Sequence, residues 1–180
     1  MKLMIASDIH GSAYYAAKML DRLAEEAPGR LLLLGDVLYH GPRNDLPRDY
    51  APKRVIELLN PLSSRLLCVR GNCDTEVDQM VLKFPILAEY AMICDGDRAF
   101  IATHGHHLDE VASALGSGVI LYGHTHIPDN TLRDGIRYIN PGSVSIPKNG
   151  SRHSYMTYSD GLFEFKDIET GEAFDSFCID

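Results

Sequence analysis

The chain has 180 residues, with 17 Lys and Arg against 25 Asp and Glu and a formal net charge of −8. This length predicts one domain, residues 1–180, that can fold without a disulfide or a structural metal. The negative charge argues against a nucleic-acid-binding protein, because such a surface repels phosphates. No apolar run approaches the roughly 18 residues of a membrane-spanning helix, so no membrane contact is expected.

The first half of the chain alternates apolar strands with helices. Apolar runs predict buried strands over Leu3–Ala6, Leu31–Leu34 and Leu66–Val69, and helical spacing predicts helices over Ser12–Glu26 and Pro52–Asn60. Strands that alternate with helices favour parallel pairing through right-handed crossovers. The sequence therefore predicts an α/β architecture for this half.

The second half is dominated by hairpins. Asp95-Gly96-Asp97-Arg98 and Asp134-Gly135 are typical turns between paired strands. A short helix is expected over Val111–Leu115. The further expected strands are Ala91–Cys94, Ala99–Thr103, Val119–Tyr122, Thr131–Arg133, Ile136–Ile139, Ser154–Tyr158, Leu162–Asp167 and Ala173–Cys178.

The cysteines and the N-terminus indicate a reducing compartment. Four widely spaced cysteines form no CxxC pair, which is typical of free thiols, and we expect Cys68, Cys94 and Cys178 to be small core residues on strands. The apolar segment before Asp8 is too short for a signal peptide. We therefore expect a cytoplasmic protein.

Five short polar motifs follow the ends of predicted strands. They are Asp8-Ile9-His10, Gly35-Asp36, Gly71-Asn72-Cys73-Asp74, His104-Gly105 and Gly123-His124-Thr125-His126. Ligands bind beyond the carboxyl ends of strands in open α/β sheets, so these side chains are expected to converge. Residues i and i+2 of an extended chain point to the same side, which would let each DxH or HxH pair present two ligands to one cleft.

The motifs together offer more ligands than one metal ion needs. Three oxygen donors and four imidazoles suffice for two divalent ions, and paired ions most often serve phosphoryl chemistry. Mixed carboxylate, amide and imidazole ligands suit Mn²⁺, Fe²⁺ or Zn²⁺, and we expect Mn²⁺ first. Asp36 lies centrally in the set and is our choice for a carboxylate that bridges the two ions.

The order DxH, GD, GN, H and GHxH resembles that of the calcineurin-like metallophosphoesterases, and in particular the small bacterial YfcE-type phosphodiesterases. The resemblance covers nearly the whole chain. It includes the long loop Gly35–Asn44, the Cys-containing segment Val69–Asp74 and the segment Asn140–Pro147. It implies a four-layer αββα sandwich, in which two mixed β-sheets pack together between helices.

The resemblance also implies the roles of individual residues. One metal ion would be held by Asp8, His10, Asp36 and His126, and the other by Asp36, Asn72, His104 and His124. The implied reaction is hydrolysis of a small phosphodiester by in-line attack of a hydroxide that bridges the two ions. Asp36, Asn72, Cys73 and His104 are the expected catalytic residues.

Cys73 departs from the pattern of the wider superfamily, in which many members carry His after this Asn. A thiol with a reference pKa of about 8.5 is a poorer acid than imidazole near 6.5, so protonation of the leaving group becomes the weak step. This favours diesters with good leaving groups. Cys73 is also a candidate substrate contact, together with His40, Arg43 and Asn44 in the long loop.

Two alternative functions remain at this point. The chain could be a phosphomonoesterase or protein phosphatase of the same superfamily, against which Cys73 argues. It could be a protein-binding scaffold of the same fold with a degraded metal site, against which the complete ligand set argues. The exposed ends of two sheets are also compatible with a homo-oligomer.

Overall fold

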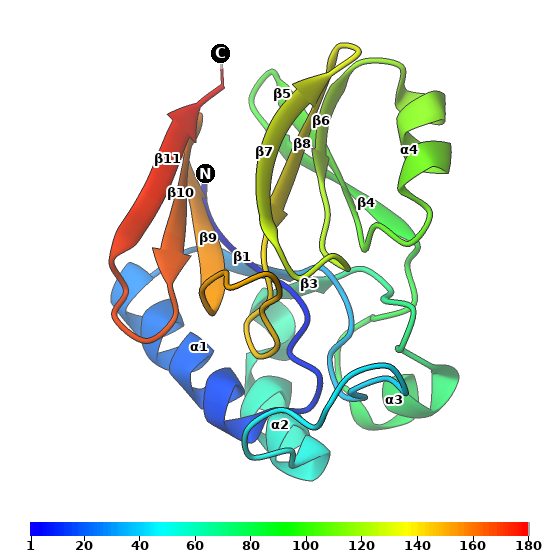
Figure 1. Cartoon of the computed structure of the whole chain (residues 1–180), viewed down its shortest axis with the longest axis vertical. Helices are drawn as coiled ribbons and strands as arrows, with labels where there is room; N and C mark the ends of the chain where they lie inside the picture. The colour runs from blue at the N-terminus through cyan, green and yellow to red at the C-terminus, as the bar shows by residue number, and fades with distance from the viewer. Residues whose placement is uncertain (180) are drawn as a thin grey trace.

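Two mixed β-sheets form the centre of the molecule, and helices cover their outer faces (Figure 1). The structure is a computed structural model that describes residues 1–179. The first sheet has the strand order β11-β10-β9-β1-β2-β3. Its strands are β1 (Lys2–Ala6), β2 (Arg30–Leu33), β3 (Leu66–Cys68), β9 (Ser154–Ser159), β10 (Leu162–Asp167) and β11 (Ala173–Cys178).

The second sheet has the order β4-β5-β6-β8-β7. Its strands are β4 (Tyr90–Asp95), β5 (Arg98–Thr103), β6 (Gly118–Leu121), β7 (Pro128–Arg133) and β8 (Ile136–Pro141). Each sheet has a parallel core: β1, β2 and β3 in the first, and β5, β6 and β8 in the second. Hairpin strands pair antiparallel at the edges. The predicted parallel pairing and hairpins are therefore confirmed.

Local sequence signals mark the beginning of the first two helices. The helices are α1 (Ala13–Glu26), α2 (Pro52–Leu59), a 3₁₀ helix (Asn60–Arg65), α3 (Glu76–Val81) and α4 (Leu108–Leu115). Ser12 caps α1 by accepting the Tyr15 N–H, and Pro52 lies in the first turn of α2. The sequence did not predict α3. This helix begins with a capping box between Thr75 and Asp78, and it leaves Val77 exposed, so it has no apolar periodicity to detect.

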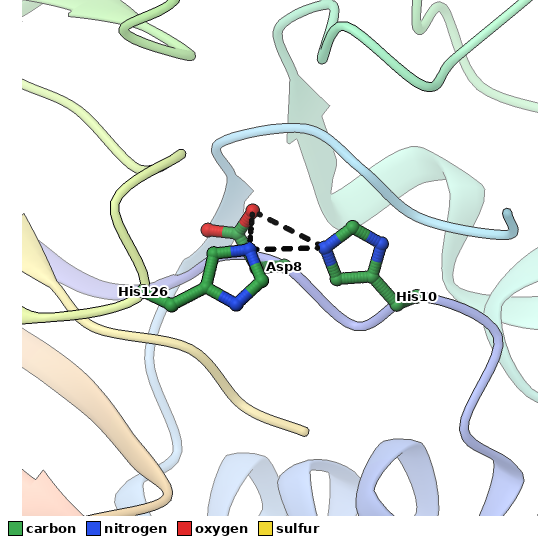
Figure 2. A group of neighbouring side chains, drawn as sticks. All are labelled: Asp8, His10 and His126. Carbon is green, nitrogen blue, oxygen red and sulfur yellow. Dashed lines mark hydrogen bonds and ion pairs between the residues drawn. The ribbon is translucent and has the colours of Figure 1, made fainter. Parts of the chain in front are cut away.

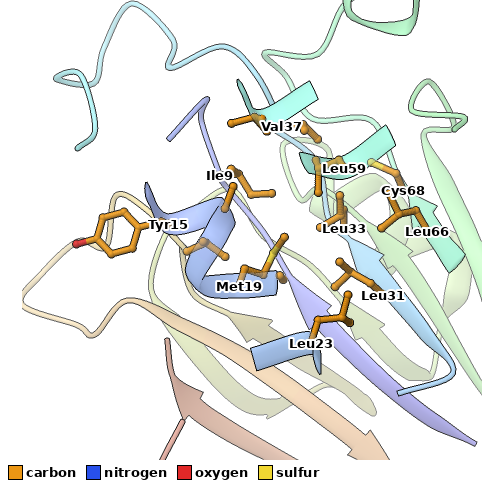
Figure 3. Packing of buried hydrophobic residues seen from close by; sticks show 14 of the residues in the cluster. Ile9, Tyr15, Met19, Leu23, Leu31, Leu33, Val37, Leu59, Leu66 and Cys68 are labelled. Carbon is orange, nitrogen blue, oxygen red and sulfur yellow. The ribbon is translucent and has the colours of Figure 1, made fainter. Parts of the chain in front are cut away.

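Side chains of β1 point alternately to the two faces of the first sheet and so belong to two different layers of the core. Met4 and Ala6 face α1 and α2, where Met19 and Leu59 are buried against the sheet (Figure 3). Leu3 and Ile5 face the opposite way and belong to the core between the two sheets. On the far side, α4 packs on the outer face of the second sheet. The four-layer αββα architecture is confirmed.

The expectation for the cysteines is only partly right. Cys68 is buried beneath the helices, but Cys94 and Cys178 are exposed on strands β4 and β11. Both of these strands lie at sheet edges, where one face is open to solvent. The apolar character of a cysteine therefore did not predict its burial there. Among residues 1–179, none of the helices has the length and apolar character needed to cross a bilayer.

Candidate metal centre

The five polar motifs lie at the carboxyl ends of the parallel strands of both sheets. Asp8 follows β1, Asp36 follows β2, Asn72 follows β3 and His104 follows β5, while the GHTH motif follows β6. Packing two sheets face to face brings these ends to one edge of the molecule. The side chains form two adjoining clusters of three predicted ligands each, and the seventh predicted ligand, Asp36, lies between them.

The buried cluster contains Asp8, His10 and His126 (Figure 2). The Nε2 atoms of His10 and His126 lie 3.2 Å apart. Asp8 Oδ1 lies 3.6 Å from His10 Nε2 and 3.3 Å from His126 Nε2. The three side chains are at most 3% exposed. Three ligand atoms thus surround one buried point.

The open cluster contains Asn72, His104 and His124. Asn72 Oδ1 lies 3.1 Å from His104 Nε2 and 2.8 Å from His124 Nδ1. The two imidazole nitrogens are themselves 3.3 Å apart. His104 is fully buried, whereas His124 is half-buried and Asn72 is exposed. This cluster therefore opens to solvent.

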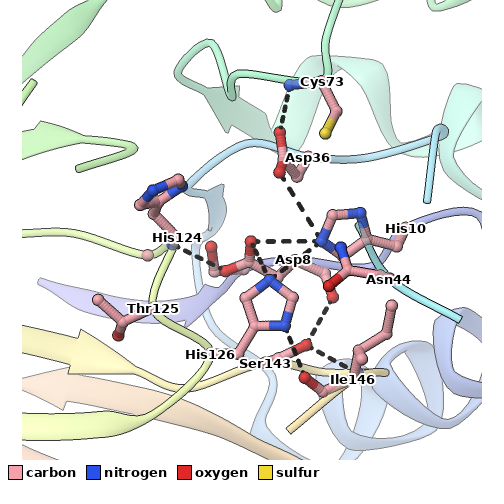
Figure 4. A network of polar contacts seen from close by, with 12 residues as sticks. Asp8, His10, Asp36, Asn44, Cys73, His124, Thr125, His126, Ser143 and Ile146 are labelled. Carbon is pink, nitrogen blue, oxygen red and sulfur yellow. Dashed lines mark hydrogen bonds and ion pairs between the residues drawn. The ribbon is translucent and has the colours of Figure 1, made fainter. Parts of the chain in front are cut away.

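Asp36 lies between the two clusters, and Figure 4 shows its contacts with His10 and Cys73. Its Oδ2 is 3.7 Å from His10 Nε2 on one side and 3.4 Å from His104 Nε2 on the other. Its Oδ1 accepts the backbone N–H of Cys73 at 2.8 Å. One carboxylate oxygen therefore faces both sets of imidazoles, as a bridging ligand would.

Three histidines are oriented by their second ring nitrogen. The Nδ1 atoms of His10, His104 and His126 each lie 2.6 to 2.7 Å from a backbone carbonyl, those of Tyr39, Leu34 and Ile146 respectively. A carbonyl only accepts, so each Nδ1 carries a proton, and the ring in its neutral form presents the lone pair of Nε2 to the cluster.

The Nε2 lone pairs of His10 and His126 accept no hydrogen bond in the described part of the chain. The Nε2 atoms of His10 and His126 face each other with no donor between them, and buried Asp8 Oδ1 has no hydrogen-bond partner within residues 1–179. Buried polar atoms without partners are costly. A bound cation satisfies all three atoms, so the donor set fits a divalent metal ion.

The carboxylates control the charge of the site. Burial opposes ionisation of Asp8, but His10 and His126 hold the pKa of its carboxyl well below its usual range. Burial likewise disfavours the charged form of His104, yet Asp36 and Asp8 raise its pKa to about 9. Burial and the neighbouring His104 lower the pKa of His124 to about 4. The site holds negative charge that attracts cations.

The backbone brings the ligands together differently from the expected extended chain. Positive φ angles occur at Asp8 (58°), His10 (49°), Asp36 (54°), His124 (67°) and His126 (62°). Left-handed residues turn the chain sharply, so the paired side chains converge from a bend. The extended geometry expected for these pairs is therefore wrong, although their convergence is confirmed. Such conformations are costly for residues other than glycine and concentrate at functional sites.

Neighbouring residues hold Asp36 in place. A Cβ on Gly71 would lie 2.1 Å from Asp36 Oδ1, so only glycine fits beside this carboxylate. Asp74 accepts the backbone N–H groups of Asp36, Val37 and Gly71 at 2.8 to 2.9 Å. Asp74 thereby fixes the two ligand loops that follow β2 and β3.

The segment Asn140–Pro147 supports the remaining ligand loops. Ser143 Oγ donates to the carbonyl of Asp8 at 2.8 Å, and Ser145 Oγ donates to that of Ile9 at 2.8 Å. Asn140 Nδ2 donates to the carbonyl of Gly123 at 2.7 Å. This segment is a positioning element, a role that its residues alone did not reveal.

A cleft of about 520 Å³ opens over the two clusters. Of the predicted substrate contacts, Arg43, Asn44 and Cys73 line it, whereas His40 is not among its lining residues. The His40 ring instead packs against Tyr39 and Tyr50, because the loop turns it away from the cleft. Sequence reasoning missed a second cation in the cleft, Lys148, which no motif marks.

Cys73 lies between Asp36 and the cleft. Burial, together with the charge of Asp36, raises the pKa of its thiol to about 12. Its sulfur accepts the Nδ2–H of Asn72 at 3.3 Å, which turns Asn72 Oδ1 towards the imidazoles. The thiol therefore stays protonated at neutral pH and orients a ligand.

The sequence is similar to those of known phosphoesterases. Residues 1–159 match the model of the calcineurin-like phosphoesterase superfamily domain. The chain is 47% identical to phosphodiesterase YfcE of Escherichia coli K12 over 157 residues, which cover 86% of this chain and 85% of that protein. It is 26% identical to the probable metallophosphoesterase YsnB of Bacillus subtilis, with 86% and 82% covered.

Solved structures give the same result. The structure of E. coli YfcE, described as a phosphoesterase, superposes with a TM-score of 0.91 over 100% of both chains, at 40% identity. Vacuolar protein sorting 29 from Cryptosporidium parvum superposes with a TM-score of 0.67 at 16% identity, covering 99% of this chain and 98% of that one. The second likeness concerns the fold alone. By its sequence and its fold, the chain belongs to the calcineurin-like phosphoesterase superfamily, a family of enzymes that hydrolyse phosphoesters.

Proposed function

We propose that the protein is a phosphodiesterase that depends on two divalent metal ions. The observation that carries the proposal is the position of Asp36 Oδ2, 3.7 Å from His10 Nε2 and 3.4 Å from His104 Nε2. A carboxylate oxygen between two sets of imidazoles is the arrangement that a bridged pair of ions requires. Similarity to YfcE, which is named a phosphodiesterase, supports the choice of diester.

Each cluster would hold one ion. Asp8, His10 and His126 would bind the first and Asn72, His104 and His124 the second, with Asp36 shared. When bound, the ions would supply a hydroxide nucleophile for in-line attack on phosphorus and neutralise charge on the phosphoryl oxygens. The mixed ligands suit Mn²⁺, with Fe²⁺ or Zn²⁺ as alternatives.

The chain's own residues then bind and orient the substrate. Arg43 and Lys148 line the cleft and attract the anionic phosphate. Cys73, whose pKa is raised to about 12, is a poor general acid at neutral pH, so it gives little help to a leaving group. The site therefore favours a small phosphodiester with a good leaving group over a monoester or a phosphoprotein. The scaffold function is not favoured, because the ligand set is complete.

The test combines metal analysis with matched substrates. The protein is stripped of metal and reconstituted with Mn²⁺, Fe²⁺ or Zn²⁺, and the bound metal is counted. Hydrolysis of bis-para-nitrophenyl phosphate is compared with that of para-nitrophenyl phosphate. We expect about two ions per chain and faster hydrolysis of the diester. Asp36→Ala should lose both ions and most of the activity, at least about a thousandfold.

Asp45→Ala is the matched control, since Asp45 is an exposed carboxylate in the same loop. It should keep both the ions and the activity. Full diester hydrolysis by Asp36→Ala would contradict the proposal. A single bound ion in the fully active protein would contradict the dinuclear mechanism.

A further inference from the structure

A second cavity, of about 820 Å³, lies beside the proposed metal centre, between α4 and strands β4 and β5. Ligand pockets typically have volumes of roughly 300 to 1,000 Å³. This cavity is separate from the cleft of about 520 Å³ that Arg43 and Lys148 line, which we call the cationic cleft. Binding of metal ions does not require it. Figure 1 shows α4 alongside the second sheet.

The cavity adjoins the metal centre at Asn72. Asn72 lines both the cavity and the cationic cleft. His106 lines the cavity wall, and its ring centroid is 5.6 Å from that of His104 and 6.3 Å from that of His124. A phosphate at the open cluster would therefore have one of its ester groups at the mouth of this cavity.

The lining of the cavity is largely apolar. Ile101 contributes from β5, and Val111, Ala114 and Leu115 contribute from α4. The Tyr90 ring, which is 66% exposed, adds an aromatic face. An apolar or aromatic group would gain free energy by leaving water here.

The charges of the lining disfavour a second anion. Arg70 is the arginine of the lining. It forms an ion pair with Glu89 at 3.2 Å, and the Nε–H of Arg70 donates to the carbonyl of Asp74 at 3.4 Å. Glu110 adds an acidic group at the rim, where its Oε1 lies 3.4 Å from His107 Nδ1. The cationic cleft differs, because Arg43 and Lys148 line it. The two spaces flanking the metal centre therefore suit different chemistry.

We infer that this cavity binds one alcohol component of the diester, and that this component is uncharged and apolar or aromatic. The inference rests on the proposed diesterase function and specifies its substrate class. The diester would be asymmetric, with a polar or anionic component in the cationic cleft. Ala114 would then determine specificity through the size of the cavity.

The test measures binding, so it does not depend on turnover. Benzyl methyl phosphate and dimethyl phosphate have poor leaving groups, and their dissociation constants are measured by NMR titration of the zinc-loaded protein. We expect the benzyl ester to bind roughly 10- to 100-fold more tightly, as burial of one aromatic ring implies. A carboxylate on the ring should remove most of that preference.

Ala114→Trp should fill the cavity and reduce the preference to about threefold or less, while the affinity for dimethyl phosphate stays unchanged. Ser113→Trp is the matched control, because Ser113 is exposed on the same helix and does not line the cavity. It should keep the full preference. Ala114→Leu replaces the Trp variant if thermal melting shows that the latter does not fold.

The outcomes separate the two proposals. Equal affinities in the parent protein, an unchanged preference in the folded Ala114 variant, or an equal loss for both ligands would each overturn the subsite. A preference that depends on Ala114, in a protein that hydrolyses no diester, would uphold the subsite and contradict the proposed function. Hydrolysis of bis-para-nitrophenyl phosphate without any preference for the benzyl ester would support the proposed function and contradict the subsite.

Discussion

The two ligand clusters use the same kinds of side chain but differ in burial. In the buried cluster, Asp8, His10 and His126 are at most 3% exposed. In the open cluster, only His104 is buried, while Asn72 is exposed and lies at the junction of two clefts. Burial removes water as a competing ligand, so the buried cluster is suited to holding an ion, whereas the open one is suited to meeting a substrate.

The largest effect is expected where the clusters meet. In Gly71→Ala, the new Cβ would lie 2.1 Å from Asp36 Oδ1 and displace the shared carboxylate. We expect loss of both ions and a fall in hydrolysis of about a thousandfold or more. Metal analysis measures the number of bound ions, and diester turnover measures the fall in hydrolysis. Gly29→Ala is the control, since its Cβ would meet only the Lys2 carbonyl at 3.6 Å; two retained ions in Gly71→Ala would contradict the shared role of Asp36.

Removing a ligand from only one cluster should have a smaller effect, the loss of one ion rather than two. Asn72→Ala removes an oxygen that lies 2.8 Å from His124 Nδ1, so the second ion should be lost and the first retained. We expect one ion per chain and hydrolysis reduced by about a hundredfold or more. His126→Ala is the counterpart, and it should release the buried ion instead. Identical metal affinities in the two variants would remove the proposed difference between the clusters.

The histidine pKa values predict how metal uptake depends on pH. In the metal-free protein, carboxylates raise the pKa of His104 to about 9 against the effect of burial, so at pH 7 a metal ion must displace its proton. Affinity should rise with pH from 7 towards 9, by up to about tenfold per unit for each proton released, and then level off. His124, with a pKa lowered to about 4, has no proton to lose in this range.

Titration calorimetry in buffers of different ionisation enthalpy counts the released protons. The metal-free protein is titrated at pH 7, 8 and 9 with the same divalent ion. An affinity that does not change between pH 7 and 9 would show that no imidazole proton is displaced.

The smallest effect is expected at the edge of the open cluster. Cys73→His places a group with a reference pKa near 6.5 where the thiol pKa is raised to about 12. We expect hydrolysis of methyl phenyl phosphate, whose phenolate is a poorer leaving group than para-nitrophenolate, to rise by about tenfold or more relative to that of bis-para-nitrophenyl phosphate. Cys73→Ala, which provides no acid, is the control. An equal ratio of the two activities in both variants would show that residue 73 does not assist the leaving group.

Local patterns determined most of the secondary structure and identified the candidate metal ligands. Runs such as Leu31–Leu34 and turns such as Asp134-Gly135 predicted the strands because burial and turn chemistry depend on near neighbours. The metal-ligand types in five ordered motifs carried enough chemistry to indicate a two-ion site. The short helix α3 was missed because its capping signal came without an apolar face.

Only the tertiary structure decided how the ligands meet and what surrounds them. The left-handed backbone at Asp8 and His10, the exposure of Cys94 and the turning away of His40 depend on contacts between distant segments. Lys148 lines the cleft over the ligands because distant loops meet there, and Ala114 lines the neighbouring cavity because α4 packs on the second sheet. A sequence specifies which groups are available, but the distances between them arise only when non-local packing fixes the loops that carry them.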